Sequence, residues 1–421
     1  MFYHHKHAVR RILSFYALLR EITINSPLNK GESAPRIAFV VNHAAFFVSH
    51  RLALATGAKA FGYEVALFTG QPGSLLMEES AEQRLAEERI THTRSLFRSS
   101  GINPFFELFG LIQLIQNIYK FNPTIIHCAS PKAVLYGGIA ARILNIPGLV
   151  LAISGMGYAF TSTGDNKFRR IFIKKIYEVI INFIFRHPNI IVITQNKDDY
   201  REISSKKMMN QSSVELIRGS GVDLSLFVSA DATKKEKLVL LPARMLRDKG
   251  VKEFVDAVRI IRSEATEWRF VLAGAASYDN PTAISNSELE HWASTAGVEW
   301  VGHIEDMTSL FTDAAIVCLP SYREGMPKVL LEAAAAGCAI VTTDVTGCRE
   351  AIEPGVTGDL VPARDHHALA SALRSLILDD NKREQYGING QQRATALFSI
   401  NAVVGHTINI YDALNRAGHL H

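Results

Sequence analysis

The clearest chemical pattern in the sequence is a pair of glutamates, Glu324 and Glu332, with seven residues between them. The apolar run AIVCLPS precedes them, and Gly337 follows a helical pattern that contains Glu332. The segment predicts a strand that ends at Ser321, a loop that carries Glu324, and a helix that begins near Pro327. Free N–H groups at such a helix start favour a phosphate. The two carboxylates are then left to accept hydrogen bonds from hydroxyl groups such as those of a sugar or a ribose.

A second pattern, PARMLRDKGVKEF, supplies cations. Arg244 and Lys249 flank a turn that follows a predicted strand, and Gly250 and a helical pattern come next. Both cations are thus expected in a loop at the carboxyl end of a strand, where ligands of open α/β sheets bind. Two such cations neutralise a diphosphate without a metal ion. Either pattern alone also fits solvated surface charge, so the interpretation depends on finding both in one domain.

These loops belong to an alternation of strands and helices that begins at Arg36. Short β-branched runs such as RIAFVV and NIIVITQ recur in the first half, and a second series begins at KLVLLPAR. The alternation predicts an α/β fold with two Rossmann-like, doubly wound domains that face each other across a cleft. The predicted parts are a basic amphipathic extension at 1–35, a first domain at 36–218, a second domain at 219–400, and a C-terminal helix at 401–421 that packs back toward the first domain.

Composition narrows the class of protein. Of the 421 residues, 48% are hydrophobic and 20% are charged, which predicts a soluble globular protein. The four cysteines lack Cys-x-x-Cys spacing, and the basic start of the chain has no apolar signal-peptide core. We therefore expect neither a zinc ribbon nor secretion, and we place the protein in the cytoplasm. No membrane-spanning helix is predicted, because polar residues interrupt the most apolar stretch, 102–119.

Charge is divided unevenly along the chain. Residues 1–217 carry a formal charge of +10, and the remainder carries −6. The extension and the stretch KFRRIFIKKIYEVIINFIF suit an acidic membrane surface, although both can also pack on the body of the protein. Five basic residues of that stretch are hard to bury: Lys167, Arg169, Arg170, Lys174 and Lys175. We expect peripheral association with the inner face of the cell membrane. Nucleic acid is not expected, because no aromatic stacking platform accompanies the charge.

Together, ARMLRDKGVKEF and PSYREGMPKVLLEAAAAGCAIVTT resemble the donor domain of a retaining family 4 glycosyltransferase of GT-B fold, in which the spacing of Glu324 and Glu332 is the hallmark. In the first half, FFVSHRLALATGAKAFGYEV, SPKAVLYGGIAARI and ISGMGYAFTS are similar to enzymes that extend bacterial surface polysaccharides, such as O-antigen or capsule, on undecaprenyl diphosphate. The resemblance covers the chain from Arg36 to its end.

The resemblance implies roles for the matching residues. Arg244 and Lys249 hold the donor diphosphate, Glu324 contacts the transferred sugar, and these three are the catalytic candidates. Glu332 binds the ribose hydroxyls. The rest of the implied donor site is the loop and helix start that lie under the sugar and the phosphates: Gly325, Met326, Pro327, Lys328, Val329 and Leu330.

The acceptor side offers four candidates at predicted strand ends: His50, Arg51, His127 and Lys132. Many relatives carry a Gly-Gly pair after the first strand, where this chain reads NHAAFF. Many also carry a second histidine two residues after His127, where this chain has Ala129. A lone histidine is more often structural than catalytic, so we do not base the mechanism on His127.

The resulting prediction is a retaining glycosyltransferase with no metal and no cofactor. It moves a sugar, which we take to be an N-acetylhexosamine, from a UDP-sugar to an undecaprenyl-diphosphate-linked saccharide. Two alternatives stay open: a sugar-nucleotide epimerase or hydrolase of the same fold, and a non-catalytic nucleotide-sugar-binding subunit. A dinucleotide oxidoreductase is disfavoured, because GMGYAF lacks the third glycine and does not follow the first strand.

Overall fold

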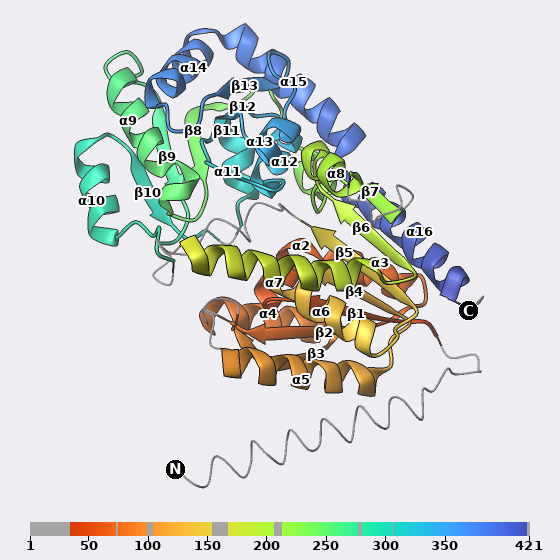
Figure 1. Ribbon diagram of the computed structural model, residues 1–421. Coiled ribbons are helices and arrows are strands. Elements are labelled where there is room, and N and C mark those ends of the chain that lie inside the picture. The colour runs from red at the N-terminus through yellow and green to blue at the C-terminus, as the bar shows by residue number, and fades with distance from the viewer. Residues whose placement is uncertain are drawn as a thin grey trace. The chain divides into compact units, whose positions relative to one another are not determined.

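The computed structural model describes residues 34–72, 75–98, 104–153, 167–205, 213–276, 280–304 and 306–418. Nearly all of the predicted extension lies outside these residues, as does the segment GMGYAF. The chain forms two compact units (Figure 1). The first comprises Met1–Ala152, Ala159–Ile191 and Ile408–His421, and the second comprises Ile153–Tyr158 and Val192–Thr407.

Most strands of a seven-stranded sheet, with the order β3-β2-β1-β4-β5-β6-β7, belong to the first unit, whereas β7 and the last three residues of β6 belong to the second. The central strands consist mostly of apolar residues, and every residue of β4 and β5, including His127, is buried. That pattern belongs to parallel strands covered by helices on both faces. The strands are β1 (Arg36–Val41), β2 (Glu64–Gln71), β3 (Thr91–Arg98), β4 (Ile125–Ala129), β5 (Gly148–Ile153), β6 (Ile190–Thr194) and β7 (Val214–Leu216).

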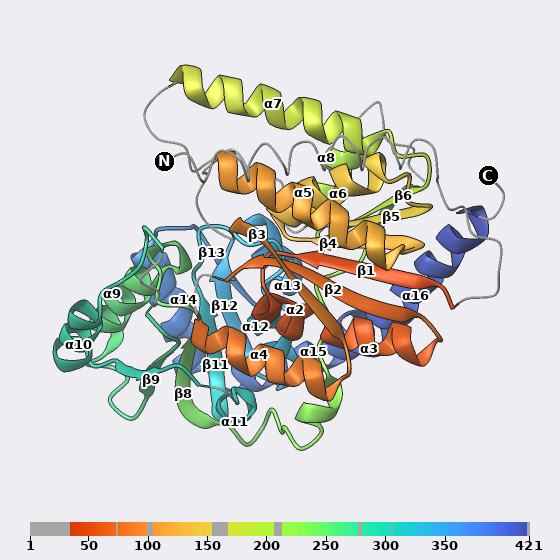
Figure 2. The ribbon, with the colours of Figure 1, turned by 90° about the horizontal axis from the view of Figure 1, so that it is seen from below.

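Helices cover both faces of this sheet (Figure 2). One face carries α5 (Pro104–Phe121), α6 (Pro131–Ile143) and α7 (Lys167–Phe185), and the other carries α2 (Ala44–His50), α3 (Leu52–Ala60) and α4 (Leu75–Glu87). Helix α8 (Lys197–Ser204) connects β6 to β7. Within the described part of the chain, no helix has both the length and the apolar character needed to cross a bilayer.

The second unit contains a six-stranded parallel sheet with the order β10-β9-β8-β11-β12-β13. The direction of the winding reverses between β8 and β11, which is the place where open α/β sheets bind their ligands. The strands are β8 (Glu236–Pro242), β9 (Arg269–Ala273), β10 (Glu299–Gly302), β11 (Ala314–Leu319), β12 (Ala339–Thr343) and β13 (Gly358–Val361).

An apolar core lies on each face of the second sheet. One contains residues of α9 (Val251–Ile261), α10 (Asn286–Thr295) and α14 (His366–Leu378). The other contains residues of α11 (Thr308–Asp313), α12 (Lys328–Ala335), α13 (Thr346–Ala351) and α15 (Asp380–Leu397). All four cysteines are free and buried. The structure therefore confirms the α/β class and the two doubly wound sheets.

The last helix, α16 (Ile400–Gly418), contributes to both units, and its residues from Ile408 onward pack in the first. At the predicted domain boundary near residue 218, β7 still pairs with β6 of the first sheet. Residues from Val192 onward nevertheless pack mainly in the second unit. The boundary at 218 and 219 stays a prediction.

Candidate active site

The loops that follow β8 and β11 lie directly against each other at the carboxyl edge of the second sheet. Gly250 ends the first loop with φ at +70°, and a Cβ atom there would lie 2.1 Å from the carbonyl oxygen of Pro320. The backbone N–H of Tyr322 donates to the carbonyl of Asp248 over 2.9 Å. Only glycine allows this close approach, which brings Lys249 to the loop of Glu324.

Lys249 and Glu324 form an ion pair at this edge. Lys249 Nζ lies 2.5 Å from Glu324 Oε1, and the side chains are only 22% and 13% exposed. The hydroxyl of Ser321, which is buried, donates to the same Oε1 atom over 2.8 Å. Oε2 has no hydrogen-bond partner among the described residues. The carboxylate is thus held by one oxygen, with the other left for a ligand.

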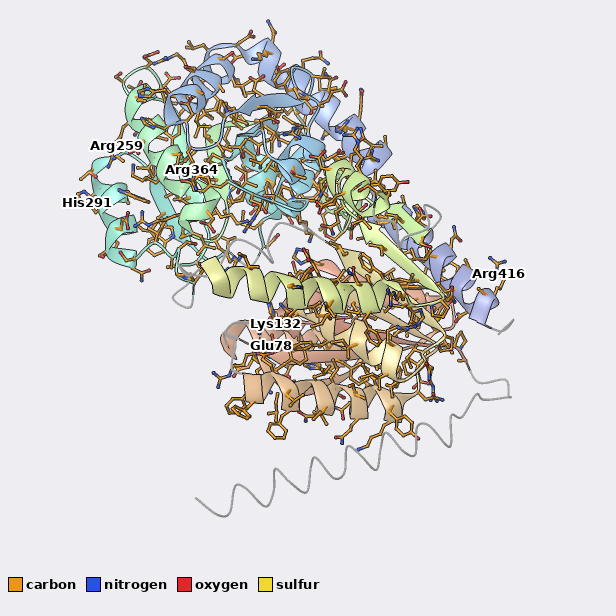
Figure 3. The ribbon with its side chains drawn as sticks, viewed as in Figure 1. Glu78, Lys132, Arg259, His291, Arg364 and Arg416 are labelled. Atoms are coloured by element: carbon orange, nitrogen blue, oxygen red, sulfur yellow. The ribbon has the colours of Figure 1, made fainter. Side chains whose placement is uncertain are left out.

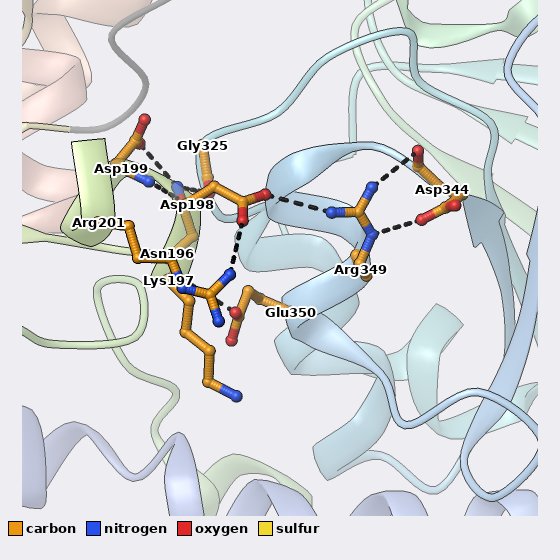
Figure 4. A network of polar contacts seen from close by, with 9 residues as sticks. All are labelled: Asn196, Lys197, Asp198, Asp199, Arg201, Gly325, Asp344, Arg349 and Glu350. Carbon is orange, nitrogen blue, oxygen red and sulfur yellow. Dashed lines mark hydrogen bonds and ion pairs between the residues drawn. The ribbon is translucent and has the colours of Figure 1, made fainter.

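Hydrogen bonds to two backbone carbonyls also hold this loop, and Figure 4 shows the one from Asn196 to Gly325. The carbonyl of Glu324 accepts a hydrogen bond of 3.1 Å from the N–H of Gly347, and the carbonyl of Gly325 accepts one of 3.2 Å from Nδ2 of Asn196. A Cβ atom on Gly347 would lie 2.3 Å from the Gly325 oxygen. Sequence reasoning missed Ser321, Asn196 and Gly347 as parts of the site.

Helix α12 begins at Lys328, with Pro327 as its N-cap residue, and Gly337, with φ at +80°, lies just past its end. The N–H of Leu330 donates to the carbonyl of Pro327 over 3.0 Å. Other N–H groups in the first turn of a helix point away from it and can meet a ligand. Lys328 Nζ lies 3.2 Å from Glu332 Oε1, one turn along the helix. Burial raises the pKa of Glu332, and the positive charge of Lys328 opposes that shift.

The other predicted donor residues divide into two groups. Met326 and Leu330 are buried in the core of the second unit, and Val329 packs against that core, so these three shape the loop from below. Arg244 follows β8 at the same edge as Lys249 and is exposed. Its guanidinium makes no hydrogen bond or ion pair with any residue that the structure describes, so its charge is available to a ligand.

The acceptor candidates lie in the first unit. His50 ends α2, stacks on Phe46 with ring centroids 4.6 Å apart, and donates from Nδ1 to the carbonyl of Phe46. Arg51 is buried, and burial lowers the pKa of its guanidinium to about 10. Its Nη1 donates to the carbonyl of His50, whereas Nε has no partner among the described atoms. Arg51 is therefore enclosed by the protein.

His127, on β4, is also buried. Its Nδ1 shares a hydrogen bond of 2.6 Å with the hydroxyl of Tyr411, and its ring stacks on Phe39. Burial, together with the nearby charge of Arg51, holds the pKa of His127 well below its usual range. The ring is therefore neutral, and Nε2 is buried with no partner among the described atoms.

Lys132, labelled in Figure 3, lies in the first turn of α6. Its ammonium is 2.9 Å from Glu107 Oε1 and donates to the carbonyl of Arg98 over 2.8 Å. The roles of the four acceptor candidates stay predictions.

Glu78 is a further residue that sequence reasoning missed. Its buried carboxylate accepts hydrogen bonds from the N–H groups of Ala44 (2.8 Å) and Ala45 (3.2 Å) at the start of α2. Arg94 lies 3.8 Å from the same carboxylate. In the loop NHAAFF, the protein's own anion therefore takes the first-turn N–H groups. No spacing in the sequence indicates this contact.

Two family models match the chain, one in each half. A model described as glycosyl transferase 4-like matches residues 36–196, and a model described as glycosyl transferases group 1 matches residues 225–393. The second match contains every predicted donor residue. No cluster of three or more His, Cys, Asp and Glu side chains that could hold a metal ion occurs among the described residues.

Two curated proteins illustrate the likeness. The chain is 28% identical, over 330 residues, to the N,N'-diacetylbacillosaminyl-diphospho-undecaprenol alpha-1,3-N-acetylgalactosaminyltransferase of Campylobacter jejuni, across 75% of this chain and 84% of that protein. It is 25% identical, over 337 residues, to the capsular polysaccharide biosynthesis glycosyltransferase CapM of Staphylococcus aureus, across 77% of this chain and 85% of that protein.

Among solved structures, HepE of Anabaena in complex with UDP and glucose has a TM-score of 0.69 and 17% identity, over 89% of this chain and 99% of that one. With the two doubly wound sheets, this likeness shows that the chain has the GT-B fold. The chain belongs to family 4, the group 1 glycosyltransferases, which retain the anomeric configuration of the sugar. The epimerase, hydrolase and binding-subunit alternatives are thereby set aside.

Proposed function

We propose that the chain transfers an N-acetylhexosamine from a UDP-sugar to an undecaprenyl-diphosphate-linked saccharide during synthesis of a bacterial surface polysaccharide. The observation that carries the proposal is the contact of Lys249 with Glu324 where the winding of the second sheet reverses. It joins a cation suited to a diphosphate and a carboxylate suited to sugar hydroxyls in one site.

The donor is proposed to lie along the loops after β8 and β11. Arg244, which has no protein partner among the described residues, and Lys249 bind the diphosphate with the first-turn N–H groups of α12. Glu324 accepts hydrogen bonds from the sugar through Oε2. Glu332 accepts hydrogen bonds from the ribose hydroxyls. The first turn of α12, Lys328 included, lies between these two carboxylates in the chain.

The chemistry follows from where charge develops. As the bond between the anomeric carbon and the diphosphate oxygen breaks, negative charge grows on UDP and positive charge grows on the sugar ring. The fixed cations stabilise the first, and the carboxylate of Glu324 stabilises the second. The acceptor hydroxyl forms its new bond on the face that the diphosphate leaves, and its proton passes to the departing phosphate oxygen. The products are UDP and an α- or β-glycoside with the donor's own configuration.

The acceptor is inferred from the named activity of the Campylobacter relative, which adds N-acetylgalactosamine to a sugar on diphospho-undecaprenol. The capsule enzyme of Staphylococcus points to the same class of pathway. A polyprenyl acceptor requires access to a membrane surface. On the first unit, apolar side chains are exposed near the start of α5 (Phe105, 74% exposed, and Phe106) and along α7 (Ile176 and Val179).

A transfer assay tests the proposed function. The full chain is incubated with UDP-N-acetylgalactosamine, UDP-N-acetylglucosamine, UDP-glucose or GDP-mannose and an undecaprenyl-diphosphate-linked N-acetylhexosamine, and the lipid product is followed by mass spectrometry. We expect extension of the lipid by one N-acetylhexosamine with either or both UDP-N-acetylhexosamines. Extension with GDP-mannose alone, or consumption of the UDP-sugar at the same rate with and without acceptor, contradicts the proposal.

Membrane association is tested separately with vesicles that contain anionic lipid. We expect the full chain to cosediment with them and to bind more weakly when residues 1–35 are removed, or when four basic residues are neutralised: Arg169, Arg170, Lys174 and Lys175. Neutralising Lys252 and Arg259, exposed on α9 of the second unit, is the control. Unchanged sedimentation of both altered chains contradicts a docking role for the basic stretches.

A further inference from the structure

We propose that Asn196 is a positioning residue for the transfer reaction: its carboxamide holds the carbonyl of Gly325 and so fixes the direction in which Glu324 presents its carboxylate to the donor sugar. The inference rests on the proposed role of Glu324 in the preceding section. Neither the family spacing nor any sequence pattern assigns Asn196, which lies more than a hundred residues before Glu324 in the chain.

Asn196 is fully buried and lies two residues after the end of β6. As the N-cap residue of α8, it accepts a hydrogen bond of 2.8 Å through Oδ1 from the N–H of Asp199. Its Nδ2 donates both to Oδ2 of Asp199 (2.7 Å) and to the carbonyl of Gly325 (3.2 Å). Because the Asp199 carboxylate accepts hydrogen bonds, it holds the NH₂ side of the amide in place and leaves the second N–H directed at Gly325.

The start of α8 is anchored by contacts that do not involve Gly325 (Figure 4). Asp198 Oδ2 lies 3.2 Å from Arg349 Nη1, and Arg349 also pairs with Asp344 over 2.5 Å. The N–H of Lys197 donates to Oε1 of Glu350 over 3.3 Å. Since α8 is held independently, the hydrogen bond from Asn196 constrains the loop, and its loss releases the loop rather than the helix.

The loop has a second fixed point on its other side. Gly347 donates to the carbonyl of Glu324 and leaves no room for a Cβ atom, which would lie 2.3 Å from the Gly325 oxygen. Gly347 and Asn196 therefore hold the carbonyls of two successive peptide units, which meet at the Cα atom of Gly325. With the side chain of Glu324 held only at Oε1, the orientation of these peptide units sets where Oε2 points.

The test compares Asn196→Ser with Asp198→Asn in the full chain. Serine still caps α8 but is too short to reach Gly325. Asp198→Asn removes an ion pair from the same helix end without touching the loop. For Asn196→Ser we expect kcat for transfer to fall 10- to 100-fold and the donor KM to change less than threefold. The Kd of UDP is expected to stay within twofold, because UDP lacks the transferred sugar that Glu324 is proposed to contact. Asp198→Asn is expected to keep kcat within twofold.

An unchanged kcat in a folded Asn196→Ser chain overturns the inference, and so does a parallel loss of kcat and UDP affinity, which indicates general damage to the site. Gly347→Ala pushes the same peptide from its other side and is expected to give the same split. If Asn196→Ser does not fold, Gly347→Ala serves as the test, and a normal kcat in the Gly347→Ala chain contradicts the inference. A wild-type chain that transfers nothing from any UDP-sugar contradicts the proposed function instead.

Discussion

Replacing Lys249 with methionine tests the proposed stabilisation of the leaving diphosphate. The change keeps the length of the side chain and removes its charge. A unit charge about 4 Å from another, at an effective dielectric constant near 20, contributes roughly 4 kcal/mol. Only the charge that develops in the transition state counts toward kcat, and we take this as roughly half a unit, or about 2 kcal/mol. That corresponds to about a 30-fold loss of kcat.

Partial exposure sets the expected range. Lys249 is 22% exposed, so solvent and salt screen part of the interaction, and we expect a loss of about 10- to 100-fold. The assay is the initial rate of UDP release at saturating donor and acceptor. Lys237→Met is the matched control. Lys237 lies near the start of β8, the strand that precedes the loop of Lys249, and it forms an exposed ion pair with Glu267. A loss below threefold for Lys249→Met, or an equal loss for Lys237→Met, refutes the reasoning.

Three further predictions follow from the same structure. Burial raises the pKa of Glu332 above 4.5, so the Glu332 carboxyl binds its proton more tightly in the folded chain than in the unfolded chain. The free energy of unfolding therefore falls as the pH rises from 4.5 through the pKa of Glu332 in the folded chain. Glu332→Gln should therefore gain unfolding free energy relative to wild type across that interval in urea titrations; a difference that is constant with pH contradicts this. EDTA should leave transfer largely intact, because Arg244 and Lys249 neutralise the diphosphate; strong inhibition reversed by magnesium or manganese would refute it. Tyr411→Phe should lower the unfolding free energy by about 1–3 kcal/mol, because Nδ1 of the buried His127 loses its partner; a cost below about 0.5 kcal/mol in urea unfolding argues against that bond.

The sequence was sufficient to predict both sheets and to place Lys249 and Glu324 in loops at the carboxyl ends of strands in one domain. Uninterrupted β-branched strands identify parallel sheets, and the carboxyl ends of neighbouring parallel strands lie at one edge. The glycine at position 250 was visible too, although only the structure shows that it is needed for the close approach to Pro320.

The sequence could not predict the contacts that depend on the direction in which a single side chain points. His127 and Arg51 follow or end predicted elements, which suggested a ligand, but their side chains point into the first unit. Asn196 and Glu78 act through hydrogen bonds to backbone groups far away in the chain. Such contacts leave no periodic pattern and no spacing, so only the folded chain shows them.

Calorimetric titration of the full chain with UDP, GDP, dTDP and ADP tests whether the loops after β8 and β11 bind a uridine nucleotide. We expect UDP to bind more tightly than the other three, and we expect Glu332→Ala, which removes the proposed ribose contact, to weaken that binding at least tenfold while the chain stays folded. Equal affinity for all four nucleotides, or UDP binding that is unchanged in Glu332→Ala, would contradict this expectation.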